Sequence, residues 1–327
     1  MDCKLMEDTA SFLPLIILLF YFLLISLIIL PLMSWLMVRV ARNRLYHLNT
    51  RIILILHCVG IAVHCSDRLV LHSSDLYRWL IVMPETSACD IISSSERCFA
   101  LRLFLNIGVF FSICTTPTIV IERWLATIHV STYQRNRHGW IWLIFFQIAL
   151  SSGLLTLIYS ETTFEGFTIY CIAAKASIPF KMLLAFLLTT VVQTVSILAF
   201  KFLMYRNKKL KQSLQSSGSA LTKRYQVEES LRSLKTISLP IHIMYLFQCS
   251  HSITSFLVLN FSSYFPRRWY YFWMEVSAFV PEYAIVFVIS FIIQERWLQK
   301  QSSTSLKRKI EVNPEVYFDQ YKQSWTT

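Results

Sequence analysis

Four polar side chains stand inside long apolar stretches of this sequence: Arg102, Asn106, His251 and Glu275. Polar and ionisable groups are costly within hydrocarbon, so they usually face the interior of a helix bundle or a water-filled cavity. Arg102 and Asn106 are one helical turn apart and therefore share a face. We expect the four to bound a cavity for a small organic ligand with one polar group, because such sites often form between bundle helices. The alternative is that Arg102 and Glu275 form a purely structural ion pair.

Glu122 and Arg123 form a second charged feature. They follow directly after the apolar stretch 100–121, which contains Arg102 and Asn106 near its start. Arg123 follows Cys98 by 25 residues, which is about 37 Å of helix. Arg123 is either an anchor that reaches toward the lipid headgroups or part of an ion pair with Glu122 that is released when helices move. Glu228 or Glu229 could also contact Arg123 in a resting state. The alternative for these two glutamates is a solvated basic helix with weak local salt bridges.

The eight cysteines divide into two groups. One group lies within apolar stretches, where free thiols usually serve as small apolar side chains: Cys58, Cys65, Cys114 and Cys249. The other group lies in segments expected on the oxidising side of the membrane, where disulfides persist: Cys3, Cys89, Cys98 and Cys171. Four cysteines permit three pairings. A Cys98–Cys171 bond is favoured, because it would hold a long loop across the mouth of the bundle, and this leaves Cys3–Cys89 as the second bond.

Seven apolar stretches, each long enough to cross a bilayer as a helix, position these residues. Backbone polar groups cannot be satisfied by lipid, so stretches of this length are helices and not strands. The sequence predicts an all-α membrane protein, a seven-transmembrane helix bundle over 1–293 with a cytoplasmic tail over 294–327. The predicted spans are 13–38, 52–71, 100–121, 139–159, 178–205, 234–261 and 269–293.

Lys and Arg are concentrated in alternate connecting segments. The set 39–51, 122–138, 201–235 and the tail holds 22 of them, while the amino terminus, 67–97, 160–177 and 262–268 together hold 7. Basic residues favour the cytoplasmic side. We therefore expect the amino terminus outside and the carboxyl terminus inside, in the plasma membrane. Acidic Glu7 and Asp8 precede the first span, where a signal peptide would carry positive charge. We therefore expect this span to remain as an anchor and not to be a cleaved signal.

Composition excludes several other classes of protein. The net charge of +12 would suit nucleic acid, but the charges lie beside helix ends, so we expect contact with anionic lipid and no nucleic acid partner. A chain that is 55% hydrophobic and 15% charged is too apolar for a water-soluble fold. Six glycines leave little material for phosphate-binding loops, and no metal-ligand spacing is present. We expect no enzymatic activity, no metal and no cofactor.

The helix layout, the cysteine at the outer end of the third span and the Glu-Arg pair at its inner end resemble those of G-protein-coupled receptors. The spacing of Cys98 and Arg123 is similar to that of rhodopsin-like receptors. Other marks of that class are missing. The second span has His57 and His64 in place of a buried Asp, and the seventh has Val-Pro-Glu-Tyr at 280–283 in place of an Asn-Pro pattern.

A closer resemblance is to the nematode serpentine chemoreceptors, of class alpha/beta or class alpha. Four stretches carry it: RLYHLNT at 44–50, SERCFALR at 95–102, IER at 121–123 with Ala-Thr at 126–127, and LTKRYQVEESLR at 221–232. The resemblance covers nearly the whole chain. It implies a small odorant-like ligand, a heterotrimeric G protein that binds the cytoplasmic loops, and a location that could include a sensory cilium.

The alternative function is a seven-helix ligand-gated channel or transporter subunit, as in insect odorant receptors, whose amino terminus is cytoplasmic. The distribution of basic residues opposes it, because that orientation would place most of them outside. The position of the amino terminus therefore distinguishes the two functions.

Overall fold

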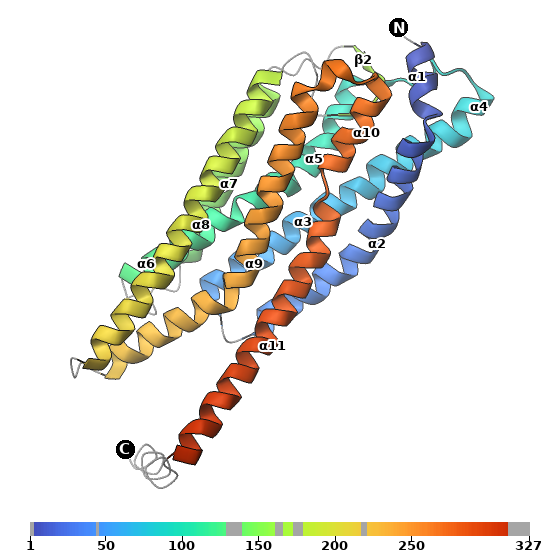
Figure 1. Cartoon of the computed structure of the whole chain (residues 1–327). Helices are drawn as coiled ribbons and strands as arrows, with labels where there is room; N and C mark the ends of the chain where they lie inside the picture. Colours follow the sequence, from blue (N-terminus) through green and yellow to red (C-terminus); the bar gives the residue numbers. More distant parts are fainter. Residues whose placement is uncertain are drawn as a thin grey trace.

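The computed structural model describes residues 3–43, 46–128, 139–160, 166–172, 179–216 and 221–312. Over these residues the chain is helical apart from one two-stranded antiparallel ladder, and its long helices run lengthwise in an elongated bundle (Figure 1). The elements are α1 (Cys3–Ala10), α2 (Leu13–Arg42), α3 (Leu48–Tyr77), η1 (Arg78–Val82), α4 (Met83–Glu85), β1 (Ser93–Ser94), α5 (Ser95–Ile113), α6 (Thr115–Ile128), α7 (Gly139–Tyr159), β2 (Phe167–Thr168), α8 (Pro179–Ser216), α9 (Leu221–Asn260), η3 (Ser262–Tyr264), α10 (Arg267–Ser277) and α11 (Val280–Val312).

Six helical stretches of the described chain are long and apolar enough to cross a membrane: Leu13–Arg42, Leu48–Glu85, Ser95–Ile128, Gly139–Tyr159, Phe180–Leu214 and Arg267–Gln301. The predicted span over 234–261 lies in α9, which is 40 residues long. It is not among the six, because polar side chains such as His242, Gln248 and His251 lower its mean hydropathy. The prediction of an all-helical multi-pass membrane protein is confirmed, while the seventh span and the orientation stay predictions.

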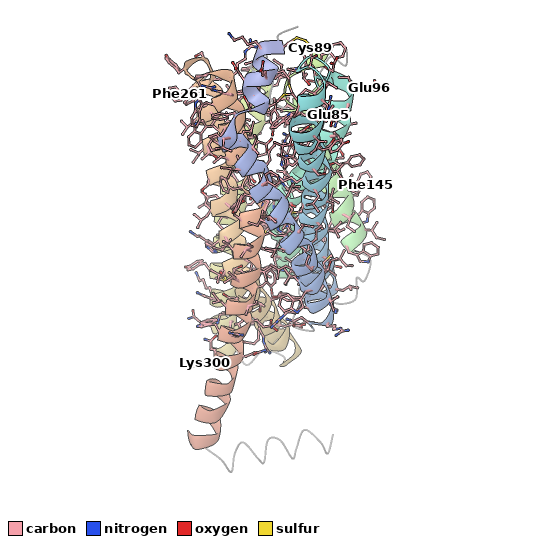
Figure 2. All side chains as sticks on the ribbon, turned by 90° about the vertical axis from the view of Figure 1, so that its right-hand side faces the viewer. Glu85, Cys89, Glu96, Phe145, Phe261 and Lys300 are labelled. Carbon is pink, nitrogen blue, oxygen red and sulfur yellow. A yellow bond between two sulfur atoms is a disulfide. The ribbon has the colours of Figure 1, made fainter. Side chains whose placement is uncertain are left out.

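The two ends of the bundle differ in character (Figures 1 and 2). One end, called here the disulfide end, carries α1, α4, the β ladder and Cys89. The other, called here the basic end, carries the carboxyl-terminal part of α11, including Lys300. α11 continues to Val312, so the predicted boundary between bundle and tail at 293 lies inside a helix.

The main core is a cluster of buried apolar side chains contributed by α2, α3, α6, α7, α8, α9 and α11. Its fully buried members include Leu36, Ile53, Phe200 and Phe287. The outward faces are also apolar: on α7, Trp142 is 76% exposed and Phe145 is 66% exposed. Large exposed apolar surfaces mark contact with a partner or a membrane, and here they surround a bundle that has membrane-spanning lengths.

The third predicted span, 100–121, is divided into two helices at Cys114. The sequence predicts one helix there, and Pro117 explains the difference. Proline has no N–H, so it cannot bond to the carbonyl of Ile113, four residues earlier. The side-chain amide of Gln193 in α8 donates to that carbonyl instead, at 2.7 Å. The break therefore ties α5 to α8.

The seventh predicted span, 269–293, is also divided, at Ala278 between α10 and α11. Pro281 leaves the carbonyl of Ser277 without its helical partner. His251 Nδ1 of α9 donates to that carbonyl at 2.7 Å. A polar side chain from a neighbouring helix thus satisfies the carbonyl at this break as well.

The second predicted span, 52–71, is too short, because α3 continues to Tyr77. The last turns of α3, from Asp67 onward, carry buried polar residues on both sides of the predicted end. Arg68 is fully buried, and Asp67 and Asp75 are 9% and 5% exposed. The statement that this span lacks a buried Asp is therefore wrong.

α3 and α5 approach each other closely at two glycines. A Cβ added to Gly108 would lie 2.5 Å from the carbonyl oxygen of Gly60 and 2.8 Å from the backbone nitrogen of His64. A Cβ added to Gly60 would lie 2.6 Å from Ser112 Oγ. Both positions require glycine for this packing distance.

Candidate functional site

A cavity of about 70 Å³ lies between α5, α7, α8, α9 and α10, in the half of the bundle nearer the disulfide end. Arg102, Asn106, His251 and Glu275 all line it. The rest of its wall is mainly apolar, with Leu105, Val109, Phe110, Ile158, Met182, Phe186 and Met274 among its members. Since a water molecule needs about 10–15 Å³ of such space, the cavity has room for several waters or a small organic molecule. The structure therefore brings the four predicted ligand-binding residues together.

Arg102 and Glu275 form a buried ion pair at the edge of this cavity. Arg102 Nε also donates to the carbonyl oxygen of Cys171, and the Tyr170 hydroxyl donates to Glu275 Oε1 at 2.9 Å. Burial, with Glu275 close by, raises the pKa of Tyr170 well above its ordinary value, so the phenol remains a donor. Buried pairs need such additional hydrogen bonds to offset the loss of solvation.

Asn106 and His251 line the cavity from two helices, α5 and α9. Asn106 Nδ2 donates to the Tyr159 hydroxyl at 2.5 Å. Because His251 Nδ1 donates to a carbonyl oxygen, the Nε2 atom of a neutral His251 ring is an acceptor. The ring meets Phe186 edge-on, with centroids 5.8 Å apart. The cavity thus combines apolar walls with a few fixed polar groups, as small-molecule sites do.

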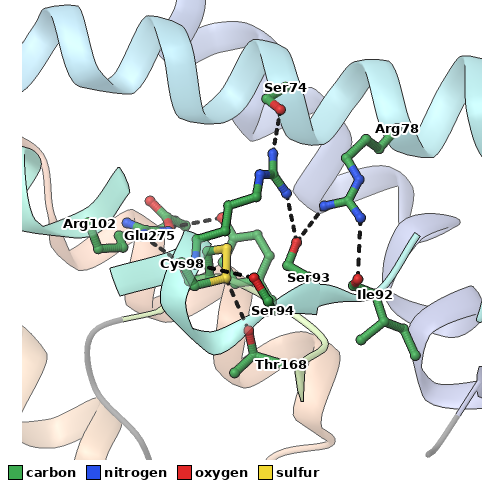
Figure 3. The surroundings of a disulfide bond; sticks show 12 residues. Ser74, Arg78, Ile92, Ser93, Ser94, Cys98, Arg102, Thr168 and Glu275 are labelled. Carbon is green, nitrogen blue, oxygen red and sulfur yellow. Dashed lines mark hydrogen bonds and ion pairs between the residues drawn. A yellow bond between two sulfur atoms is a disulfide. The ribbon is translucent and has the colours of Figure 1, made fainter. Parts of the chain in front are cut away.

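A disulfide and a short β ladder hold the loop after α7 against α5 (Figure 3). β1 pairs with β2 in register Ser93↔Thr168. The disulfide Cys98–Cys171 joins the chain a few residues after each strand. Arg78 and Arg97 both donate to Ser93 Oγ, at 2.5 and 2.9 Å. This places the Cys171 carbonyl where Arg102 binds it, so the loop and the ion pair position each other.

The second disulfide, Cys3–Cys89, holds α1 against the segment that follows α4. Met6 and Ala10 of α1 are buried there beside Trp79 and Tyr170. α1 therefore covers the disulfide end next to the Arg102–Glu275 pair.

Sequence reasoning missed two members of the charged cluster: Arg68, which stands near the end of the predicted second span, and His72, one residue beyond it. Arg68 Nη2 lies 3.8 Å from Glu275 Oε2 and donates to the Ala278 carbonyl at 2.7 Å. His72 Nε2 lies 3.9 Å from the same carboxylate oxygen. Hydrophobicity alone ended the span too early. The spacing of Arg68, His72 and Asp75 on one helical face is the signal that could have extended it.

At the basic end, Arg123 of α6 is 2% exposed and contacts two other helices, α3 and α9. Its guanidinium pairs with Glu122 and donates to Ser233 Oγ of α9 at 2.8 Å and to Thr50 Oγ1 of α3 at 2.6 Å. Thr127, one turn later, accepts from Asn207 of α8 at 3.0 Å. This end of α6 is thereby fastened to α3, α8 and α9.

The two predicted partners of Arg123 on α9 lie differently. Glu228 is exposed on α9 and forms an ion pair with Lys211 of α8. Glu229 lies near His47, where it acts electrostatically together with Glu122 and Arg123. Partial burial lowers the pKa of His47, so the neutral ring can cap α3 by accepting from the Asn49 N–H.

Among the described residues, no group of three His, Cys, Asp or Glu side chains could hold a metal ion.

Comparisons with known proteins find related sequences over most of the chain. A family model described as serpentine type 7TM GPCR receptor class ab chemoreceptor matches residues 1–326. Serpentine receptor class alpha/beta-14 of Caenorhabditis elegans is 23% identical over 277 residues, covering 81% of this chain and 69% of the relative. Serpentine receptor class alpha-6 of the same organism is 24% identical over 258 residues, covering 77% and 76%.

A third relative, serpentine receptor class beta-7 of Caenorhabditis elegans, is 31% identical over 165 residues, which is 50% of this chain and 45% of the relative. The family match spans almost every residue, including both cysteine pairs, the cavity and the Glu-Arg pair. This chain therefore belongs to the class ab family of serpentine-type 7TM GPCR chemoreceptors.

Proposed function

We propose that this protein is a seven-span chemosensory receptor of the plasma membrane. It binds a small organic, odorant-like ligand in the cavity between α5, α8, α9 and α10 and activates a heterotrimeric G protein at the basic end. The observation that supports this most directly is the meeting of Arg102, Asn106, His251 and Glu275 at one largely apolar cavity. Family membership supports the general class.

The ligand can act on the receptor because the cavity wall includes the α10–α11 break, at Ser277 and Ala278, and its partner His251. His251 lines the cavity and bonds to Ser277 at the α10–α11 break. A ligand changes an equilibrium only by its differential affinity for the two states. A ligand that alters the His251 contact therefore acts directly on the angle between α10 and α11.

The response at the basic end depends on the contacts of Arg123. Movement of α9 away from α6 separates Arg123 from Ser233 and opens the space where a G protein binds. Discrete rearrangement of packed helices is a common form of such switching. The basic segments at this end are expected to face the cytoplasm and its anionic lipids, and the sensory cilium is the proposed location in the organism.

The test is a screen of small volatile organic compounds against cells that express the chain with a calcium reporter and a G protein. For an active compound, Asn106→Leu is expected to raise the half-maximal concentration several-fold, because the cavity loses a polar contact. The matched control Asn260→Leu makes the same change at an exposed position on α9 and is expected to leave it unchanged.

Arg123→Ala is expected to abolish the calcium response while direct ligand binding to purified protein persists. Equal sensitivity of wild type and Asn106→Leu, with surface expression matched, would place the ligand elsewhere. Ligand-dependent current in cells lacking G proteins would instead support the channel alternative.

A further inference from the structure

A second polar cluster lies between α2, α3 and the α10–α11 break, and it meets the cavity at Glu275 and Ala278. Arg68 is at the centre of this cluster. The guanidinium of Arg68 stacks on the ring of Phe22, with Arg68 Cζ 3.9 Å from the ring centroid. Arg68 Nη2 donates to the Ala278 carbonyl at the break. Glu275 stands on one side of the break and Glu282 on the other, and both act electrostatically on Arg68.

Many buried polar atoms in this cluster have no hydrogen-bond partner among the described residues. They are Ser26 Oγ, Arg68 Nε and Nη1, His72 Nδ1 and Nε2, Glu275 Oε2 and Glu282 Oε2. Buried polar atoms of native proteins are almost always satisfied by protein or by ordered water. An unsatisfied one costs about 1–3 kcal/mol, more when charged, so this concentration requires an explanation.

The chemistry of the unpartnered atoms decides what satisfies them. Arg68 supplies only donors, while the two glutamates supply only acceptors. Glu275 Oε2 lies 3.8 Å from Arg68 Nη2 and 3.9 Å from His72 Nε2, too far for direct hydrogen bonds but close enough for one molecule to touch both atoms. The guanidinium repels a metal cation, and the two carboxylates repel an anion. Water is neutral, and it both donates and accepts.

We propose that ordered water molecules occupy this cluster, hydrate the guanidinium of Arg68 and complete the hydrogen bonds at the α10–α11 break. Buried waters typically make about three hydrogen bonds to otherwise unsatisfied groups, and the cluster holds seven unpartnered atoms on five side chains. This hydration site adjoins the ligand cavity at Glu275 and Ala278, but the proposal does not depend on the proposed signalling.

Radiolytic labelling tests the proposal, because hydroxyl radicals formed from bound water modify the side chains beside it. The probes are Phe22, which stacks on Arg68, and Cys65, one helical turn before Arg68. Matched controls are Phe200 and Cys114, which are also buried but belong to other parts of the core, at 0% and 1% exposure. Purified full-length protein is irradiated in detergent, and the modified residues are quantified by mass spectrometry.

We expect several-fold faster modification of Phe22 and Cys65 than of Phe200 and Cys114. In Arg68→Met the rates at the two probes are expected to fall to those of the controls, while Arg68→Lys, which keeps a charged donor, preserves most of the labelling. Equal rates at probes and controls in the wild type would overturn the proposal, and this comparison does not depend on the folding of any variant.

Discussion

Arg102 and Glu275 have two roles that a single observation does not separate. Both line the cavity, and together they form a buried ion pair supported by Tyr170 and the Cys171 carbonyl. The sequence predicts either a binding residue or a structural pair, and the geometry contains both features. The pair fixes the direction of the guanidinium, and the remaining faces of both side chains are available to the cavity.

Replacing Glu275 with Gln is expected to destabilise the protein by about 3–5 kcal/mol, because removing one member of a buried pair leaves an uncompensated charge. Thermal unfolding of purified protein in detergent measures this as a lowered Tm. Glu96→Gln is the matched control, since Glu96 is exposed on α5, and it is expected to have little effect. A Glu275→Gln protein as stable as the control would show that the pair does not hold α10 in place.

The residue types at the cavity were predictable because ionisable groups are conspicuous in apolar stretches. The side chains that donate to the backbone carbonyls left without a helical partner by the prolines were not predictable. Nothing about Gln193 in the sequence reveals that it serves the Ile113 carbonyl freed by Pro117. That relation depends on which helices are neighbours, and one sequence does not provide this information.

At the scale of the helices, their existence followed from length and hydrophobicity, while their ends did not. Amphipathic and charged turns extend α3 and α11 beyond the apolar stretches that predict them. Polar side chains remain helical there because neighbouring helices bury or pair them. The breaks at Cys114 and Ala278 depend on prolines near the starts of α6 and α11, which hydropathy does not register.

The contact of α3 with α5 gives a prediction at this scale. Gly108→Ala is expected to destabilise the protein by about 1–3 kcal/mol, because the added Cβ would overlap backbone atoms and force the two helices apart. Gly153→Ala on α7 is the control, since a Cβ there meets no atom within 4 Å. Chemical denaturation of both variants measures the difference, and equal stability would contradict the close approach.

At the scale of the whole molecule, the arrangement is a bundle with one oxidised, loop-covered end and one basic end. The distribution of cysteines and basic residues predicted this division, and the structure places both disulfides at the same end. The side of the membrane that each end faces stays a prediction from loop charge.

An epitope tag at the amino terminus is expected to be stained by antibody on intact cells, whereas a tag at the carboxyl terminus requires permeabilisation. The reason is the concentration of Lys and Arg in the segments that share a side with the carboxyl terminus. Untransfected cells and a cytoplasmic marker control for leakage. Staining of the carboxyl-terminal tag alone on intact cells would reverse the orientation and with it the signalling proposal.

The paired glycines of α3 and α5 have a mechanical consequence. Where the two backbones are in direct contact, no side chains lie between them that could change rotamer when one helix shifts along the other. We therefore expect α3 and α5 to keep their relative position. Any displacement that a bound molecule starts in the cavity must then travel through the other wall, along α8, α9 and α10. Cross-links placed between α3 and α5 would be tolerated during activation, whereas cross-links between α9 and α6 would arrest it.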